Sequence, residues 1–313
     1  MTLIKKISFL FLFSFLLFSC DEKNKFWSLF QEKDLLKHPT AKRCAECHQE
    51  IYNQWKSSRH SKSWISEYYK RATNNYSKTK CLSCHSPLEM SISKKPEFRD
   101  FHKEDGINCV SCHYFSKDNA IHGPYDVFSP PHPSTEDKHF KQSIMCASCH
   151  KETYKQWKET GSSKTCQSCH MTPIKKMKLI QKFPFQYFHF AKNVYNHSFP
   201  AKKATKNDLD IKVKKDKDTI ELHVTNKGIP HNLPTADNGK PKLYVKIETY
   251  KNNSPLESFQ KIITPKYSLK YNKEKILEFI TFEDFNKVKI KIYRKLSWQK
   301  QKELIKELSI KLK

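Results

Sequence analysis

Cysteine occurs at few places in this sequence of 313 residues. None follows Cys169, and Cys20 is the single cysteine outside five Cys-x-x-Cys-His motifs. This distribution argues against zinc ribbons, which need four ligands in two knuckles and give no reason for a histidine after every second cysteine. It also argues against a thioredoxin-like redox site, which would occur once and near a βαβ pattern. A disulfide framework is disfavoured for the same set.

The five motifs share one spacing, and this spacing has a chemical reason. Two thiols three positions apart can form thioethers with the two vinyl groups on one porphyrin edge, and the adjacent histidine binds the iron. We therefore predict five covalently attached haem c groups. The predicted thioether cysteines are Cys44, Cys47, Cys81, Cys84, Cys109, Cys112, Cys146, Cys149, Cys166 and Cys169. The predicted proximal ligands are His48, His85, His113, His150 and His170.

Residues 1–19 have the pattern of a lipoprotein signal peptide. Two lysines precede an apolar run over 7–18, which is too short to span a bilayer comfortably as a permanent helix. Leu-Phe-Ser-Cys at 17–20 resembles a bacterial lipobox, so we expect acylation of Cys20; a cleaved signal with a free Cys20 is the alternative. We expect an exported, membrane-anchored lipoprotein that faces the periplasm or cell surface, with residues 20–37 as a polar tether.

Acidic side chains are few. Asp and Glu number 32 against 58 Lys and Arg, which gives a net charge of +26 before the two signal-peptide lysines are removed. A basic surface can steer a protein to acidic redox partners or to anionic lipid headgroups. Solvated lysines from a general compositional bias are the alternative. Nucleic acid is a poor partner for an exported haem protein.

The chain between the first and last motif is short for the number of haems that it is predicted to bind. Residues 44–170 would serve five haems, about 25 residues each. A domain with its own apolar core usually needs about 100 residues or more. We therefore expect the haems to pack against one another, as electron hopping requires, among short helices and loops.

An internal repeat relates residues 44–58 to 146–160 at a constant offset of 102. On a helix, His48, Tyr52 and Trp55 share one face, so the aromatic rings can cover a haem edge, can be core residues of an amphipathic helix, or can do both. His60 lies twelve residues after His48, about 18 Å away along a continuous helix. We expect His60 to bind the iron of a neighbouring haem; a surface histidine is the alternative.

The segment 44–60, Cys-Ala-x-Cys-His-x-x-x-Tyr-x-x-Trp-x-x-Ser-x-His, resembles the multihaem c-type cytochromes of the cytochrome c-554 group. The resemblance extends to Cys-Gln-Ser-Cys-His-Met at 166–171 and to histidine segments at 196–200 and 228–235. In similar proteins such histidine segments supply distal haem ligands or frame the haem edge. The resemblance thus implies these roles for His197 and His231.

Six histidines outside the motifs are candidates for distal ligands. His60 and the two histidines implied by the resemblance are joined by loop histidines close to the third and fourth motifs. The candidates are His60, His122, His132, His139, His197 and His231.

From about residue 205 the apolar residues alternate instead. Predicted strands cover 210–214, 219–225, 243–250, 276–281 and 288–293, and residues 298–312 have the pattern of an amphipathic helix. We expect an α+β protein: a mainly helical and loop pentahaem cytochrome domain over 38–204, followed over 205–313 by a small antiparallel β-sandwich with a C-terminal helix. The sandwich would be similar to the Ig-like domain that ends such cytochromes.

The predicted function is single-electron transfer along stacked haems between respiratory or periplasmic redox partners, with a quinol- or cytochrome-linked donor. This hypothesis makes the chain an electron carrier rather than a catalyst, and no catalytic residue is assigned. The alternative is a multihaem reductase or oxidase of small nitrogen or sulfur compounds with one open haem. No motif has the Cys-x-x-Cys-Lys form that marks the catalytic haem of pentahaem nitrite reductases. The C-terminal domain could also dock the protein on a larger complex.

Overall fold

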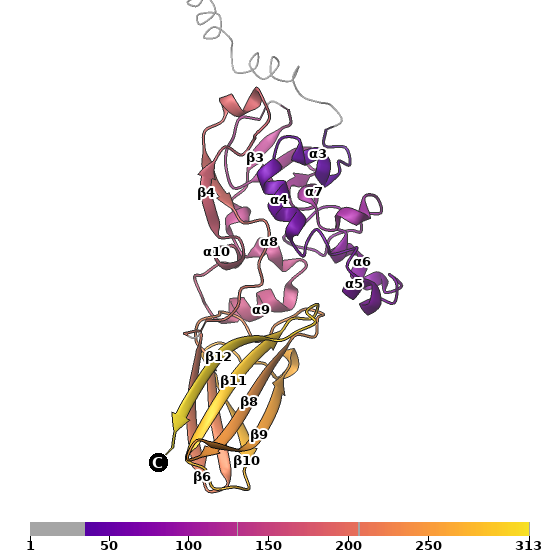
Figure 1. Ribbon diagram of the computed structural model, residues 1–313. Coiled ribbons are helices and arrows are strands. Elements are labelled where there is room, and N and C mark those ends of the chain that lie inside the picture. Colours follow the sequence, from indigo (N-terminus) through magenta and orange to yellow (C-terminus); the bar gives the residue numbers. More distant parts are fainter. Residues whose placement is uncertain (1–34, 130, 206, 313) are drawn as a thin grey trace, which may run out of the picture.

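The computed structural model describes residues 35–129, 131–205 and 207–312, in a helix-rich N-terminal part and a strand-rich C-terminal part (Figure 1). This mixed α+β composition agrees with the predicted class. The signal peptide, Cys20 and nearly all of the tether lie outside the described residues. None of the helices in the described ranges is long and apolar enough to cross a bilayer.

The helices are short, and most of them carry a haem-binding motif. Polar side chains cap the N-termini of four of them: Thr40 accepts a hydrogen bond from Arg43 N, Ser66 from Tyr69 N, Asn108 from Ser111 N and Thr165 from Ser168 N. The α-helices are α3 (Ala41–Ala45), α4 (Gln49–Ser57), α5 (Glu67–Ala72), α6 (Thr79–His85), α7 (Cys109–His113), α8 (Ile144–Ala147), α9 (Lys151–Glu159) and α10 (Cys166–His170). Single 3₁₀ turns are η1 (Lys103–Asp105), η2 (Lys138–Lys141), η3 (Phe185–Phe188) and η4 (Pro265–Tyr267).

The sequence repeat is also a structural repeat. In both copies the motif spans a break between two helices, α3 and α4 in the first and α8 and α9 in the second. His48 and His150 stand at the break with nearly the same backbone conformation, φ −110° and ψ 48° against φ −104° and ψ 50°. The other three motifs end their helices instead, at His85, His113 and His170.

Two small sheets complete the N-terminal part. One contains β1 (Tyr114–Phe115), β2 (Ala120–Gly123) and β3 (Ser134–Glu136) in that order. The other is an antiparallel pair of β4 (Pro173–Met177) and β5 (Lys192–Tyr195). The long connection between β4 and β5 carries η3 at the end of the molecule that lies farthest from the C-terminal domain (Figure 1).

The C-terminal domain has two antiparallel sheets around one core. A three-stranded sheet has the order β10-β7-β6, and a four-stranded sheet has the order β12-β11-β8-β9. Their bounds are β6 (Leu209–Asp216), β7 (Thr219–Asn226), β8 (Lys242–Lys251), β9 (Ser254–Ile263), β10 (Glu274–Ile280), β11 (Lys287–Lys295) and β12 (Glu303–Lys311). Leu222 and Val224 from one sheet and Ile247 and Ile290 from the other are fully buried in a single cluster. Each such side chain stabilises the fold by about 1.5–3 kcal/mol.

The predicted C-terminal helix is wrong, because residues 303–311 form strand β12. Ile305, Leu308 and Leu312 suit one helical face, but Leu308, Ile310 and Leu312 also alternate. In the structure Leu308 pairs with Ile290 of β11 and packs on the core. The edge of β11 thus offers backbone hydrogen bonds and apolar burial together, and this tertiary context overrides the helical pattern.

The five predicted strands correspond to β6, β7, β8, β10 and β11, whereas β9 was not predicted. Strand β9 pairs with β8 on its inner side only and is the edge of its sheet. Most of its side chains are exposed, so its sequence shows little of the apolar alternation by which the other strands are found.

Candidate functional site

Four of the five motif histidines are oriented by a backbone carbonyl. A carbonyl oxygen only accepts, so the Nδ1–H of each imidazole donates and Nε2 is left as the unprotonated nitrogen that a metal requires. The acceptors are Leu179 O for His48 at 2.7 Å, Ser63 O for His85 at 2.8 Å, His122 O for His113 at 2.7 Å, and Pro200 O for His170 at 2.8 Å. His150 differs, because its Nδ1 lies 3.5 Å from the carboxylate oxygen Oδ2 of Asp237.

Three of the predicted distal histidines face a motif histidine across a narrow gap. The ring centroids are 6.4 Å apart for His48 and His132, 6.3 Å for His150 and His60, and 6.3 Å for His113 and His197. Two imidazoles on opposite sides of one metal ion have centroids roughly 6 Å apart, because each metal–nitrogen bond is about 2 Å and each nitrogen lies roughly 1 Å from its centroid. The three pairs therefore fit bis-histidine iron.

The facing histidines are partly buried, and their surroundings favour the neutral form. Burial lowers the pKa of His60 to about 3, and lowers the pKa of His132 and His197 to about 4 each. The His197 Nδ1–H donates to Tyr195 O at 2.7 Å. The Nδ1 of His60 is buried without a hydrogen-bond partner among the described residues, while the ring of Phe199 packs at 4.3 Å.

The surroundings of the remaining two motif histidines, His170 and His85, differ from those of the three pairs. His231 donates from Nδ1 to Asn232 O at 2.9 Å. Burial is the main cause that lowers the pKa of His231, and the neighbouring His170 also lowers it. His85 is stacked on the ring of Tyr69, with centroids 3.8 Å apart and planes 10° apart. Within the described ranges no histidine ring faces His85 at the separation of the three pairs above.

Two of the predicted distal ligands, His122 and His139, are not among the three facing pairs. His122 is 3% exposed, but its Nε2 lies 2.8 Å from Asp118 Oδ2, and its own carbonyl orients His113. The side chain of His139 is 45% exposed and its Nδ1 lies 2.7 Å from Asp137 Oδ1. A carboxylate thus lies at the Nε2 of His122, the nitrogen that would have to bind iron. In the described ranges no motif histidine ring faces His139 at the separation of the three pairs above. The loop sequence alone did not reveal either arrangement.

The thiols lie where neighbouring porphyrins can pack. All ten motif cysteines are free and partly exposed. Thiols of different motifs lie within hydrogen-bonding reach of each other: Cys44 and Cys109, Cys84 and Cys149, and Cys146 and Cys166. The first motif is therefore beside the third, the second beside the fourth, and the fourth beside the fifth. This adjacency is what the short chain between the first and last motif predicts.

The C-terminal domain completes the site of the fourth motif. Asp237 Oδ1 accepts from Glu152 N at 2.7 Å, and Thr235 Oγ1 donates to Gln156 Oε1 at 2.8 Å, so the loop before β8 holds α9. Sequence reasoning missed Asp237 because no motif contains it. It also missed the carbonyl acceptors, because every residue has a carbonyl and only the fold selects which one faces an imidazole.

The aromatic residues of the repeat act as structural residues. The indole Nε1–H of Trp55 donates to Ile107 O at 2.7 Å, and that of Trp157 donates to Lys164 O at 2.6 Å. Each tryptophan therefore ties its helix to a later segment. Trp55 is buried, as a core residue would be, whereas α9 has no buried residue.

Comparisons with known proteins agree with this geometry. Residues 43–114, which contain the first three motifs, match the family described as cytochrome c554 and c-prime. The fold is similar to that of a penta-heme cytochrome c552 from Thermochromatium tepidum, with a TM-score of 0.61 and 17% identity over 88% of this chain and 100% of that chain. No curated protein matches the chain. The motifs, the family match and the shared fold together support a multihaem c-type cytochrome.

Proposed function

We propose that the chain is an exported, lipid-anchored pentahaem c-type cytochrome that passes single electrons between respiratory or periplasmic redox partners. The observation that carries this proposal is the set of three opposed histidine pairs beside adjacent Cys-x-x-Cys-His motifs. The similar fold of a penta-heme cytochrome supports the number of haems. Each haem would supply an iron that alternates between two oxidation states, and the protein would set the potential through ligands, hydrogen bonds and burial.

The haem-binding residues would have separate roles. The ten motif cysteines would hold the porphyrins, and the five motif histidines would bind the irons with tautomers fixed by their Nδ1 partners. His132, His60, His197 and His231 would be the distal ligands of the first, fourth, third and fifth haems. The C-terminal domain, which we propose is an Ig-like sandwich, would hold the fourth and fifth haems through its loops and could also dock the protein on a larger complex.

The direct test is the covalent haem content. A pyridine haemochrome assay combined with intact mass should give five haems per chain, since five motifs are present. A mass increment of four or fewer would contradict the proposal. Replacement of Cys20 by Ser tests the anchor separately, because it should release a haem-loaded, exported protein from the detergent phase.

One observation favours a second candidate function. His85 is paired with no facing histidine ring among the described residues, and the buried hydroxyl of Tyr69, whose ring stacks on His85, has no hydrogen-bond partner. This environment suits a five-coordinate haem that small molecules can reach, as in a reductase or oxidase of nitrogen or sulfur compounds. Carbon monoxide binding to one haem of the reduced protein would support it, and complete absence of binding would exclude it.

A further inference from the structure

The connection between β4 and β5 presents an unusual aromatic surface. Four of the eight exposed aromatic side chains in the described ranges lie within residues 183–190. They are Phe183, Tyr187, Phe188 and Phe190, with exposed fractions of 73%, 67%, 57% and 89%. Single exposed aromatics need no explanation, but several in one short segment are typical of an interaction site. We call this group the aromatic surface.

The segment that carries the aromatic surface has an excess of positive charge. Residues 171–200 contain five lysines and no aspartate or glutamate. Lys175 and Lys182 lie 3.6 Å from Glu50 and Glu46 respectively, whereas the ammonium group of Lys178 lies 5.3 Å above the ring of Tyr187. Aromatic rings with nearby lysines are typical of surfaces that enter the headgroup layer of anionic bilayers.

The aromatic surface is fixed to the site of the first motif. Leu179 O orients His48, Gln181 N donates to Cys47 O at 2.8 Å, and Glu50 N donates to Gln181 Oε1 at 3.3 Å. Figure 1 shows this end of the molecule opposite the C-terminal domain and on the same side as α3, near which the described chain begins. Any surface that binds here is therefore close to the first haem site.

We propose that the aromatic surface docks the protein on an anionic lipid bilayer and turns the first haem site toward it. Fourteen residues separate Cys20 from the first described residue, Leu35, and extended they span up to about 50 Å. An anchor at Cys20 thus has enough chain to let the aromatic surface reach the headgroups. The inference refines the lipid-anchored cytochrome proposed above, and it gives a membrane-side donor access to the first haem.

The test separates the aromatic surface from the anchor. The full chain with Cys20→Ser, loaded with haem, is sedimented with vesicles of phosphatidylcholine alone or with roughly one third phosphatidylglycerol. We expect binding to the anionic vesicles that salt weakens. Phe188→Ser with Phe190→Ser should weaken that binding by roughly tenfold or more, because two aromatic side chains no longer leave water.

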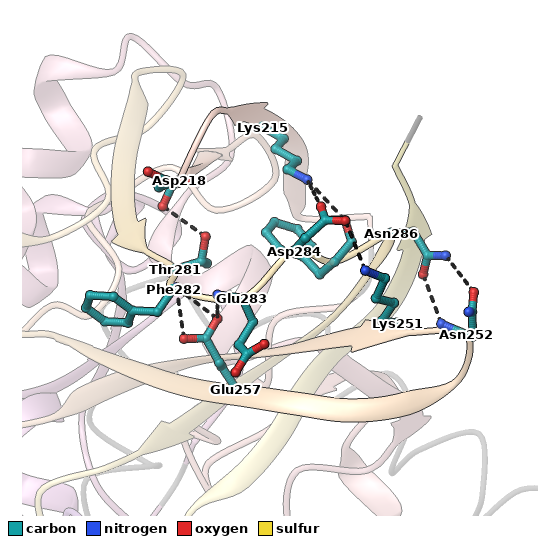
Figure 2. Close-up of polar contacts among 11 residues, drawn as sticks. Lys215, Asp218, Lys251, Asn252, Glu257, Thr281, Phe282, Glu283, Asp284 and Asn286 are labelled. Carbon is teal, nitrogen blue, oxygen red and sulfur yellow. Dashed lines mark hydrogen bonds and ion pairs between the residues drawn. The ribbon is translucent and has the colours of Figure 1, made fainter.

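A matched control is available at the other end of the molecule. Phe282 is 87% exposed, and Figure 2 shows it beside Glu257 and Glu283, with its backbone N–H donating to Glu257 Oε1 at 3.0 Å. Phe282→Ser removes a comparable ring from an acidic surface, so vesicle binding should not change. Lys178→Glu is a second variant that keeps the aromatic rings and should weaken binding to anionic vesicles only.

Two outcomes would overturn the inference. One is that the Cys20→Ser protein, with its haem content intact, does not bind anionic vesicles. The other is that it binds and the Phe188 and Phe190 variant binds equally well. If the aromatic variant instead loses electron exchange with a partner protein while vesicle binding is absent, the aromatic surface is a protein interface. A deficit in haem content would count against the proposed function and not against this surface.

Discussion

At the scale of single residues, the group that lies beside each imidazole nitrogen decides whether Nε2 is available for iron. A backbone carbonyl selects the tautomer that leaves Nε2 for iron, as for His48 and Leu179. A carboxylate at Nε2 removes that option, as Asp118 does for His122. The sequence identified all the motif residues because their chemistry is local. It did not separate His132 from His122, because the ring that faces His132, that of His48, comes from a distant part of the chain.

His60 provides the first test. Its ring faces His150 at 6.3 Å, so His60→Ala should convert the fourth haem from low spin to high spin without loss of covalent haem. The reduced variant should also bind carbon monoxide at one additional haem. His139→Ala is the control, since its side chain is 45% exposed and faces no motif histidine. An unchanged EPR spectrum for His60→Ala would show that it is no ligand.

Asp237 provides the second test. Burial opposes ionisation of this carboxyl, but hydrogen bonding from His150 keeps the pKa of Asp237 below its usual value, so it is charged at neutral pH. A negative charge 3.5 Å from Nδ1 strengthens the imidazole as a donor and favours the ferric iron. Asp237→Asn should therefore raise the midpoint potential of the fourth haem, by about 59 mV for a tenfold change in the oxidised-to-reduced ratio.

Spectroelectrochemical titration measures this shift, and Asp284→Asn is a control with the same change of charge on a carboxylate that is 73% exposed in the C-terminal domain. If the two variants have the same set of potentials as the unaltered protein, Asp237 has only a structural role in holding α9.

At the scale of elements, the backbone at Gly106 passes close to the segment that contains His60 and Ser63. Gly106 has a φ of +60°, and a Cβ there would lie 2.5 Å from His60 O and from Ser63 Oγ. The segment that contains His60 and Ser63 also orients His85, because Ser63 O accepts a hydrogen bond from its Nδ1–H. The buried guanidinium of Arg99 donates to the carbonyls of Pro87, Phe101, His102 and Gly106. These hydrogen bonds hold the backbone around Gly106 in place. Neither Gly106 nor Arg99 belongs to a recognisable motif, so the sequence could not predict their role.

Gly106→Ala should therefore displace His60. We expect partial conversion of the fourth haem to high spin and a loss of about 1–3 kcal/mol of stability, measured by EPR and denaturant unfolding. Gly161→Ala is the matched control, because Gly161 has a similar φ of +64° but no atom within 4 Å of the added Cβ. Equal effects of the two substitutions would mean that backbone strain alone, and not the crowding of His60, is responsible.

Strand pairing in the C-terminal domain gives a pH-dependent prediction. His223 Nδ1 lies 2.9 Å from Glu274 Oε2 and Nε2 lies 3.1 Å from Glu221 Oε2. Glu274 first and Glu221 second raise the pKa of His223 above 6.5, while His223 lowers the pKa of Glu274 below 4.5. The histidine contribution is complete below about pH 6.5 and is lost as the pH rises through the raised pKa. The glutamate contribution is present above about pH 4.5 and is lost in acid.

The stability that His223→Gln removes should thus be largest between about pH 4.5 and 6.5 and should shrink at higher pH. Urea unfolding of both proteins across this range, followed by circular dichroism, measures the difference. A difference that is constant with pH would show that the pair does not contribute through its charges.

At the scale of the whole molecule, two things explain how the five motifs are arranged. They are the short chain available for each motif and the long-range contacts between motifs. The short chain for five motifs predicted close packing, and the structure brings motifs together across long sequence separations, such as Cys84 and Cys149. The short helices were predictable from the binding motifs, and five strands of the C-terminal part from apolar alternation, whereas β9 and β12 were not. The dependence of the fourth site on Asp237 was not, because it arises only when the two parts of the chain pack together.

The most direct test of the central claim, that the chain carries five covalently attached haems of which four have two histidine ligands, is the EPR spectrum of the oxidised, fully loaded protein. The three facing pairs and His231 beside His170 predict four low-spin haems, and the environment of His85 predicts one high-spin haem. Two or more high-spin haems in a protein with five would contradict the paired ligands, and five low-spin haems would contradict the open site at His85.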